Sequence, residues 1–405
     1  MRPPPLLLLQ ACNALANFQA FIVIKGATSL WSERGWTSLQ TGLALALANF
    51  AYAATAALGG RVADRFGRGV ACVAGTLIAG AGCVLALATS EPVPVLVGLV
   101  LSIGGTAIYF PGCAGLFSDA EGARPGAAVA APLHAKVNRY NLGWASGIFL
   151  GFVCAALMAD LPLWSLFLAA AASCVVQFLC LAPYLRLPAQ PPAPHGDRAP
   201  HPALKRLTFM ARIAILLGCT AGMGMLSQVE QTLRAAGLTD AALRRTSSMI
   251  MAAYPLGYVG MFTLLGQWGG WVLRPWRLWA LQLGILIGSL VFLALAMTGT
   301  LATPALMLAT AMIGSGFGAV YVGSLYYSLR LPDGAARAAG LHETCIGIGN
   351  TSGPLIAGLF LSAWATSASA PSTHAMFGLG VFMVVGTALT LLWQVALIPR
   401  AMRAR

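Results

Sequence analysis

Charged side chains are scarce in this chain. Only 9% of its 405 residues are charged, and aspartate and glutamate together number 11. With 58% hydrophobic residues and a mean hydropathy of +0.79, the composition lies outside the range of soluble globular domains. The scarcity of charge therefore excludes a soluble protein and indicates a membrane protein that crosses the bilayer many times.

Motifs for metal, nucleotide and nucleic-acid chemistry are also missing. The nine cysteines stand inside apolar segments without a Cys-x-x-Cys pair, and no histidine stands at a metal-ligand spacing, so we expect no metal and no cofactor. There is no ATP-binding loop of the Walker type, which excludes ATP as a direct driving force. The net charge of +13 forms no basic stripe, which argues against a nucleic-acid partner.

Long apolar runs dominate what is present. A transmembrane helix needs about 20 mostly apolar residues to cross the hydrocarbon core. The pattern predicts an all-α membrane protein with twelve transmembrane helices. The predicted spans are 5–26, 38–60, 69–89, 92–117, 137–158, 164–185, 208–230, 246–268, 277–298, 303–329, 341–363 and 375–397.

Basic residues alternate between the predicted loops. Seventeen lysines and arginines fall in loops on the side of the two termini, four fall in loops on the other side, and three lie near helix ends. Cytoplasmic loops carry the excess of lysine and arginine in membrane proteins. We therefore expect both termini in the cytoplasm and a monomer embedded in the lipid bilayer of a bacterial cytoplasmic (inner) membrane.

A polar, proline-rich stretch divides the predicted helices six and six. It predicts a cytoplasmic linker at 186–207 between an N-terminal half, 1–185, and a C-terminal half, 208–405. Sliding one half over the other gives matches at similar offsets, which predicts two pseudo-symmetric six-helix bundles. The matches pair Gly60, Arg65 and Arg68 with Gly269, Arg274 and Arg277, and Tyr109 with Tyr321.

The loop "GGRVADRFGR", residues 59–68, lies between the second and third predicted helices. Its Gly-x-x-x-Asp-Arg-x-Gly-Arg pattern resembles the loop signature of the major facilitator superfamily, a family of transporters built from two six-helix halves. The resemblance implies that Gly60 lets helices approach, that Asp64 contacts the start of a helix of the other half, and that Arg65 and Arg68 join charge pairs. A simple positive-inside loop is the alternative, but it leaves Asp64, Gly60 and Gly67 unexplained.

Two glycine-rich stretches predict close helix packing. Small residues spaced by four let helix backbones approach in lipid. The second stretch also resembles the family's glycine-proline motif, so gating is an alternative role. That motif is typical of the fifth helix of proton-coupled exporters, whereas here it lies in the eleventh, which argues against a drug exporter. The residues concerned are Gly143, Gly147 and Gly151, and Gly349, Gly353 and Pro354.

Polar side chains within the predicted spans are candidates for a substrate cavity, because the bilayer interior penalises them unless they meet a partner or water. A hydrogen bond between helices is the alternative for each of them. Arg139 suits an anionic substrate but also suits an arginine that reaches out to the membrane surface. The candidates are Asn17, Asn49, Tyr52, Tyr109, Arg139, Asn141, Trp144, Gln228, Tyr254, Tyr321 and Asn350.

Acids within helices are the candidates for proton coupling. Glu343, beside His342, is the strongest, and Glu230 is a second. The alternative for Glu343 is an acid in the first turn of its helix. The sequence thus predicts a secondary active transporter of a small solute, not an enzyme, with proton coupling left open. The alternatives are a polytopic membrane enzyme and a membrane sensor with the same fold.

The distribution of basic residues makes the orientation testable. A cysteine introduced at Gly196 should resist an impermeant thiol reagent added outside intact cells, whereas one introduced at Ser372 should react. The protein with only its nine native cysteines gives the background labelling. The opposite labelling pattern would reverse the orientation.

Overall fold

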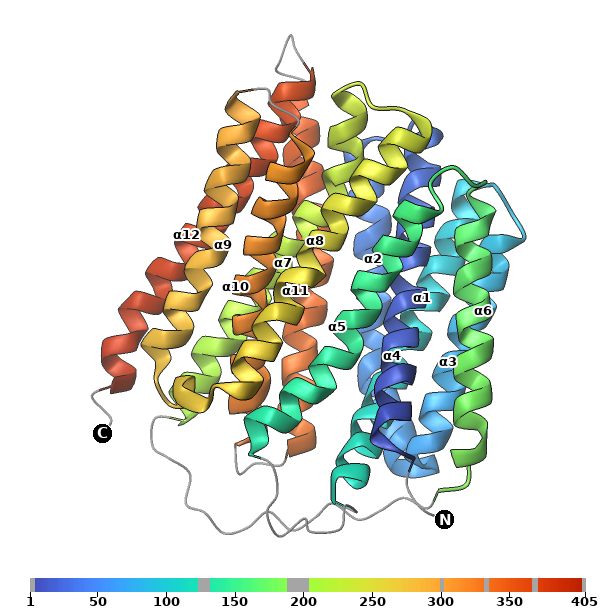
Figure 1. The fold of residues 1–405 in the computed structure, drawn as a ribbon, viewed down its shortest axis with the longest axis vertical. Helices are drawn as coiled ribbons and strands as arrows, with labels where there is room; N and C mark the ends of the chain where they lie inside the picture. The colour runs from blue at the N-terminus through green and yellow to red at the C-terminus, as the bar shows by residue number, and fades with distance from the viewer. Residues whose placement is uncertain are drawn as a thin grey trace.

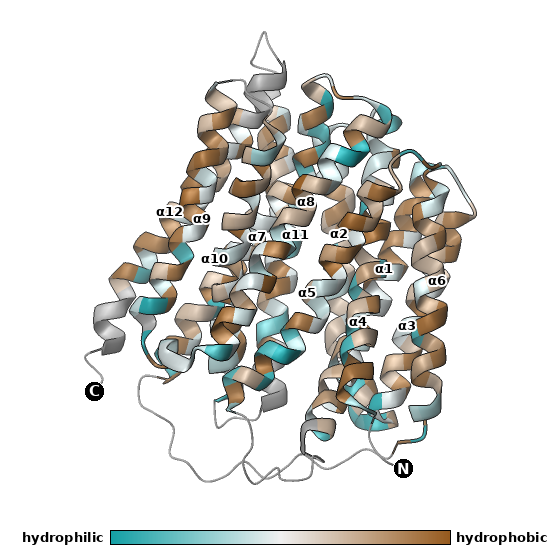
Figure 2. Ribbon diagram, in the orientation of Figure 1, coloured by the Kyte–Doolittle hydropathy of each residue, from teal (hydrophilic) through white to brown (hydrophobic). Residues whose placement is uncertain are grey.

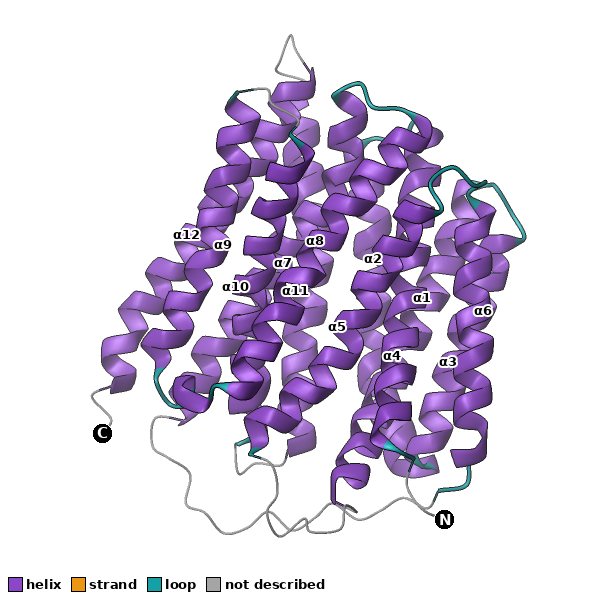
Figure 3. Cartoon of the chain, in the orientation of Figure 1, coloured by secondary structure: helices purple, strands orange, loops and turns teal. Residues whose placement is uncertain are grey.

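The computed structural model describes residues 4–122, 132–187, 204–298, 302–330, 335–365 and 371–402, and these residues contain helices and turns but no strand (Figure 3). The first six long helices are α1 (Leu6–Glu33), α2 (Ser38–Phe66), α3 (Arg68–Leu87), α4 (Pro92–Gly122), α5 (Leu133–Leu157) and α6 (Trp164–Leu181), followed by the short η2 (Ala182–Tyr184). The second six are α7 (Leu204–Ala235), α8 (Asp240–Gln267), α9 (Pro275–Met297), α10 (Thr303–Leu329), α11 (Ala335–Ala365) and α12 (Pro371–Met402), with η3 (Gly269–Trp271) before α9.

The outward faces of the helices are apolar. Large side chains such as Phe50, Leu157 and Leu392 are more than half exposed, and hydrophobic colour covers much of the helices in Figure 2. Twelve helices of the described chain are long and apolar enough to cross a membrane. The prediction of an all-helical protein with twelve spans is confirmed, and the exposed apolar surface is the one that lipid covers.

The first span is longer than predicted. We expected it to end at residue 26, but α1 continues to Glu33. Its last turns are polar yet buried, from Lys25 to Ser32. The sequence pattern treats a lysine as the end of an apolar run, whereas here Lys25 is neutralised inside the protein.

The helices form two bundles side by side (Figure 1). We call α1–α6 the N half and α7–α12 the C half. The main contacts between them pair α2 with α11 and α5 with α8. The start of α1 and the end of α12 lie at the same end of the molecule, which we call the termini side; the other end, with Glu33 and Ser38, is the opposite side. Of the predicted linker, 188–203 lie outside the described residues, and α7 begins at Leu204.

The glycines of the two glycine-rich stretches stand at close helix contacts. On α5, a side chain at Gly143 or Gly151 would lie 3.3 Å from the carbonyl oxygen of Gln10 or 3.1 Å from that of Phe18, both on α1, and Gly147 lies between them on the same helix face. On α11, a Cβ at Gly353 would lie 2.8 Å from the backbone nitrogen of Gly224 on α7. These positions have no room for a side chain without separating the helices.

The loop between α2 and α3 turns at Gly67, whose φ of 102° favours glycine. Arg68 begins α3, pairs with the carboxylate of Asp119 on α4 and donates to the carbonyl oxygen of Gly115 at 2.9 Å. The charge pair expected for Arg68 is therefore present, within the N half. The guanidinium of Arg65 lies over the ring of Phe66, 5.3 Å from its centroid.

The other three predicted roles in this loop are not seen in this conformation. Among the described residues Arg65 has no ion pair, only its contact with Phe66. Asp64 is exposed, and among the described residues its carboxylate has no hydrogen bond or ion pair. A Cβ at Gly60 would meet nothing within 4 Å, whereas a Cβ at the neighbouring Gly59 would lie only 2.7 Å from the backbone of Ile108 on α4. Close helix approach thus falls to Gly59 rather than Gly60. The contact of Asp64 with the C half stays a prediction for another conformation.

Candidate functional site

A cavity lies between the two halves near the middle of the bundle. It leaves about 120 Å³ for the centres of water-sized molecules, against roughly 10–15 Å³ for one water, so it holds about ten waters or one small organic molecule. Nine of its 22 lining residues are aromatic. The N half supplies Phe21, Tyr52, Phe110, Tyr140 and Trp144, and the C half supplies Tyr254, Tyr258, Phe317 and Tyr321.

Several of these rings form one continuous wall across the boundary between the halves. The ring of Trp144 on α5 lies 4.8 Å from that of Tyr321 on α10 and 5.5 Å from that of Tyr258 on α8, measured between centroids. Tyr254 meets Tyr258 edge-on at 5.1 Å. Ring contacts of this kind contribute about 0.5–1.5 kcal/mol beyond apolar burial. They hold α5 of one half against α8 and α10 of the other.

A carboxylate and a phenol meet on the cavity wall. The hydroxyl of Tyr52 on α2 donates to Oε2 of Glu343 on α11 at 2.9 Å, and both residues line the cavity. Because α11 begins at Ala335, Glu343 stands more than two turns inside the helix. This excludes the alternative of a first-turn acid, since the attraction of a helix start fades within one turn.

His342 points away from Glu343 despite being its neighbour in sequence. Its Nδ1 lies 2.9 Å from the hydroxyl of Ser324, its ring meets Tyr321 edge-on, and it is fully buried. Consecutive residues of a helix are about 100° apart around its axis, so only one of the two reaches the cavity. The structure does not bring this pair together as a site.

Seven of the eleven predicted cavity residues line the cavity, and four lie elsewhere. Tyr109 is buried in the N half and bonds to Cys113, and Asn141 accepts from the indole nitrogen of Trp144 at 3.2 Å. Gln228 donates to the backbone of Ser38, and Arg139 is half-buried on α5. Residues that line the cavity are Asn17, Asn49, Tyr52, Trp144, Tyr254, Tyr321 and Asn350.

Half of the lining residues are apolar and were not predicted from the sequence. Phe21, Phe110 and Phe317 line the cavity, but a search for polar groups inside apolar spans passes over them. One feature of the sequence could have identified Phe317 as a lining residue. Phe317 lies one turn before Tyr321 on α10, and residues four apart share a helix face.

An ion pair closes the cavity toward the opposite side. Nζ of Lys25 on α1 lies 2.7 Å from Oε2 of Glu230 on α7, and the side chains are 1% and 4% exposed. The hydroxyl of Ser29 also donates to this carboxylate oxygen at 3.2 Å. Glu230 therefore does not face the cavity as a free acid. It joins the N half to the C half.

Further hydrogen bonds join the halves on the same side. Arg234 donates to the hydroxyl of Ser32 at 2.6 Å, and Gln231 donates to that of Thr41 at 3.1 Å. Farther out, exposed Arg245 pairs with Asp160. We use the name polar seam for the bonds that join Lys25, Ser32 and Thr41 of the N half to α7; the exposed pair of Arg245 and Asp160 is not part of it. In this conformation the seam holds the opposite side shut.

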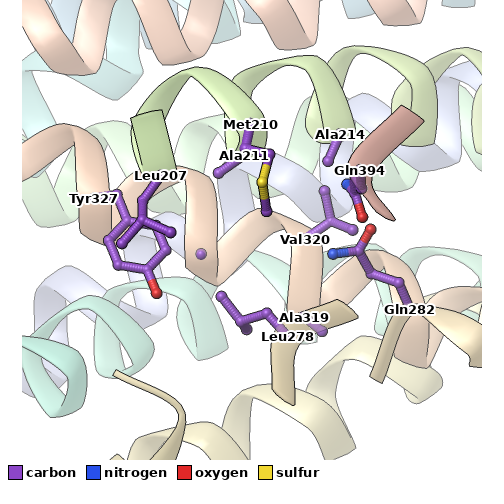
Figure 4. Close-up of a pocket in the computed structure, with 11 residues that line it drawn as sticks. Leu207, Met210, Ala211, Ala214, Leu278, Gln282, Ala319, Val320, Tyr327 and Gln394 are labelled. Atoms are coloured by element: carbon purple, nitrogen blue, oxygen red, sulfur yellow. The ribbon is translucent and has the colours of Figure 1, made fainter. Parts of the chain in front are cut away.

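Figure 4 shows a second cavity, which lies wholly within the C half between α7, α9, α10 and α12. It leaves about 20 Å³ for the centres of water-sized molecules, enough for one or two waters. Leu207, Leu278 and Val320 line it together with the buried amides of Gln282 and Gln394. Its size excludes it as a path for a solute.

Two six-helix halves around a central cavity that is sealed on one side define a membrane carrier. The described residues contain no group of three or more His, Cys, Asp or Glu side chains that could hold a metal. The chain belongs to the Major Facilitator Superfamily, whose pattern it matches over residues 6–354. It is thus a secondary transporter integral to a membrane, rather than the membrane enzyme considered as an alternative.

Solved structures share the fold at low identity. A bacterial homologue of the human lysosomal transporter Spinster, inward-facing and unoccupied, aligns with a TM-score of 0.70 and 16% identity over 98% of this chain and 96% of that one. The same homologue in its occupied state gives 0.65 and 18% over 99% and 96%. A mutant of the nucleoside transporter NupG gives 0.65 and 12% over 96% and 99%. No curated protein sequence matches.

Breaking the buried ion pair should open the opposite side. Glu230→Gln leaves Lys25 as a buried charge without a counter-charge, which should destabilise the closed conformation by about 3–5 kcal/mol. Because opening hydrates the stranded charge, we expect the open population to rise about a hundredfold or more. Spin labels at Glu91 and Thr239, exposed on the opposite side of the two halves, measure this as a longer distance.

Two variants control this experiment. Lys25→Met combined with Glu230→Gln removes both charges and should recover much of the closed population, whereas Arg245→Gln breaks only the exposed pair and should cost less than about 1 kcal/mol. If Glu230→Gln leaves the distance unchanged, the pair does not close the carrier.

Asp64→Asn should act on the other conformation. Asp64 faces solvent here, so we expect an unchanged melting temperature. If Asp64 caps a helix of the C half when the termini side closes, the same spin labels should show the state open on the opposite side falling roughly two- to thirtyfold. Asp119→Asn is the control, because Asp119 is already paired in this conformation. A lower melting temperature with unchanged distances would assign Asp64 a folding role instead.

Proposed function

We propose that this transporter moves its solute through the central cavity by alternating access and couples the movement to protons at Glu343. The observation that carries the proposal is the hydrogen bond from Tyr52 to Glu343, because it joins the two halves at the cavity wall. A carboxylate inside a membrane is costly, and such residues mark ion and proton pathways. The rest of this wall is largely aromatic and aliphatic.

Rocking of the halves changes what Glu343 contacts. α2 and α11 belong to different halves, so a movement between them makes or breaks the bond between Tyr52 and Glu343. While the bond exists the carboxylate is half-buried against the N half; when it breaks, the carboxylate meets water on the newly opened side. Gain of a proton on one side and its loss on the other would couple proton flow to the conformational change.

We also propose how the protein is oriented in the membrane and which conformation of the transport cycle this structure represents. The excess of basic residues in the loops of the termini side supports a cytoplasmic position for both termini. The polar seam then lies outside, which makes this conformation inward-facing. Similarity to the inward-facing state of the Spinster homologue agrees with this assignment. We assign the protein to a bacterial cytoplasmic membrane as a monomer.

Glu343→Gln tests the coupling without knowledge of the solute. In the wild type, the distance between labels at Glu91 and Thr239 should change between acidic and alkaline pH, because protonation removes the charge of Glu343. In Glu343→Gln the side chain cannot titrate, so we expect a distance independent of pH. Once a solute is known, the variant should also lose accumulation driven by a pH gradient but keep exchange at equal concentrations.

Glu33→Gln is the matched control, because Glu33 is an exposed acid outside the cavity. It should keep the pH response of the wild type. A pH response that persists in Glu343→Gln would rule out Glu343 as the coupling group, and a wild type without any pH response would indicate a uniporter or coupling to another ion.

A further inference from the structure

The cavity walls carry one charge. Among the described lining residues Glu343 is the only charged side chain, and the set contains no lysine, arginine or histidine. Arg139, which the sequence offered for binding an anion, is not among them. An anion in this cavity would meet the carboxylate without a compensating cation, and repulsion is strong where water is excluded. The electrostatics of the walls therefore favour a positive occupant.

The aromatic wall favours the same sign of charge. The face of an aromatic ring is negative, and it attracts a cation within about 6 Å of the ring centroid. The ring of Trp144 lies 4.8 Å from that of Tyr321 and 5.5 Å from that of Tyr258, and Tyr52 and Phe110 line the same cavity with their own rings 6.3 Å apart. Several aromatic rings and one carboxylate thus line a single cavity.

The remaining walls favour an organic solute over a bare metal ion. Inorganic cations such as Ca²⁺ need six to eight oxygen ligands, among which carboxylates are prominent. The cavity offers a single carboxylate, and its neutral amides and hydroxyls are interspersed with apolar side chains such as Ile148 and Met223. Apolar walls match a solute that carries carbon groups around its charge. The occupant that satisfies both features is an organic cation.

We propose that the transported solute is a small organic cation with an apolar or aromatic body, held by the ring faces and by Glu343 as its counter-charge. This inference rests on the proposed function, in which the same cavity is the transport site. Because the cation and a proton neutralise the same carboxylate, each excludes the other. The two therefore cross the membrane in opposite directions.

Glu343 alone accounts for the pH dependence expected of binding. The other titratable groups that line the cavity are Tyr52 from α2, Tyr140 from α5, Cys219 from α7, Tyr254 and Tyr258 from α8, and Tyr321 from α10. Unperturbed phenols and thiols are uncharged at neutral pH and remain so on acidification. Binding of a cation should therefore weaken as the pH falls and should release a proton where Glu343 was protonated.

A series of benzyl compounds of similar shape tests the proposal on the purified full chain. Benzyltrimethylammonium is the cation, neopentylbenzene its neutral isostere and benzylsulfonate the anion. We expect the cation to bind most tightly of the three, as measured by calorimetry. Its binding should also release protons, which can be detected in a weakly buffered solution. Glu343→Gln should weaken its binding about tenfold or more and abolish the proton release.

Aromatic variants provide an independent arm, with melting temperature as the check on folding. Trp144→Leu should weaken cation binding roughly two- to thirtyfold, whereas Trp164→Leu, at an exposed position on α6, should leave it unchanged. The proposal is overturned if benzyltrimethylammonium does not bind, if benzylsulfonate or neopentylbenzene binds equally well, or if Glu343→Gln binds the cation as the wild type does.

Failure of this proposal is distinguishable from failure of the proposed function. The spin-label distances need no ligand. If they respond to pH through Glu343 while the cation does not bind, the coupling stands and the solute class is wrong. If the cation needs Glu343 to bind but the distances ignore pH, the solute class stands and the coupling is wrong.

Discussion

The structure depends on how it neutralises charge away from water. Desolvating a single ion costs several kcal/mol even after the protein relaxes, and a partner must offset that cost. Lys25 and Glu230 do this for each other, and each comes from a different half. Because separating the two charges without water is costly, α1 and α7 stay in contact for as long as both side chains are shielded from water. This contact allows the polar end of α1 to be buried, and it closes the opposite side together with the other bonds of the polar seam.

Glu343 answers the same requirement in a different way. Its partner in this conformation is the neutral hydroxyl of Tyr52, so a negative charge at this position remains without a cation. Such a carboxylate is satisfied by a proton or by a positively charged occupant of the cavity. The two acids at the interface between the halves, buried Glu230 and half-buried Glu343, therefore have different roles. Glu230 has a counter-charge in this conformation and stabilises the closed opposite side, whereas Glu343 has only a neutral partner and can respond to what enters the cavity.

The architecture could be predicted from the sequence far better than the site could. Twelve apolar runs of the required length and a loop signature were enough to predict the fold, since lipid imposes length and hydropathy on every span. The cavity was harder, because facing the centre depends on helix rotation and on partners from other helices. His342 and Glu343 are adjacent in sequence but face different surroundings, and Lys25 marks a helix end by hydropathy although α1 continues beyond it. Tyr109 matches Tyr321 in the repeat, yet it lies inside its own half because the two bundles are not identical.

The dryness of the polar seam has a kinetic consequence. Pulling Lys25 from Glu230 in a dry interface would work against an almost unscreened attraction, whereas the same separation in water costs little. Water must therefore enter between α1 and α7 before, or as, the charges part. The barrier to opening is then a wetting barrier, set by how readily a few water molecules insert beside Ser29 and Thr28. The time that the carrier spends closed is then governed by the access of water to the ion pair rather than by the energy needed to deform the helices.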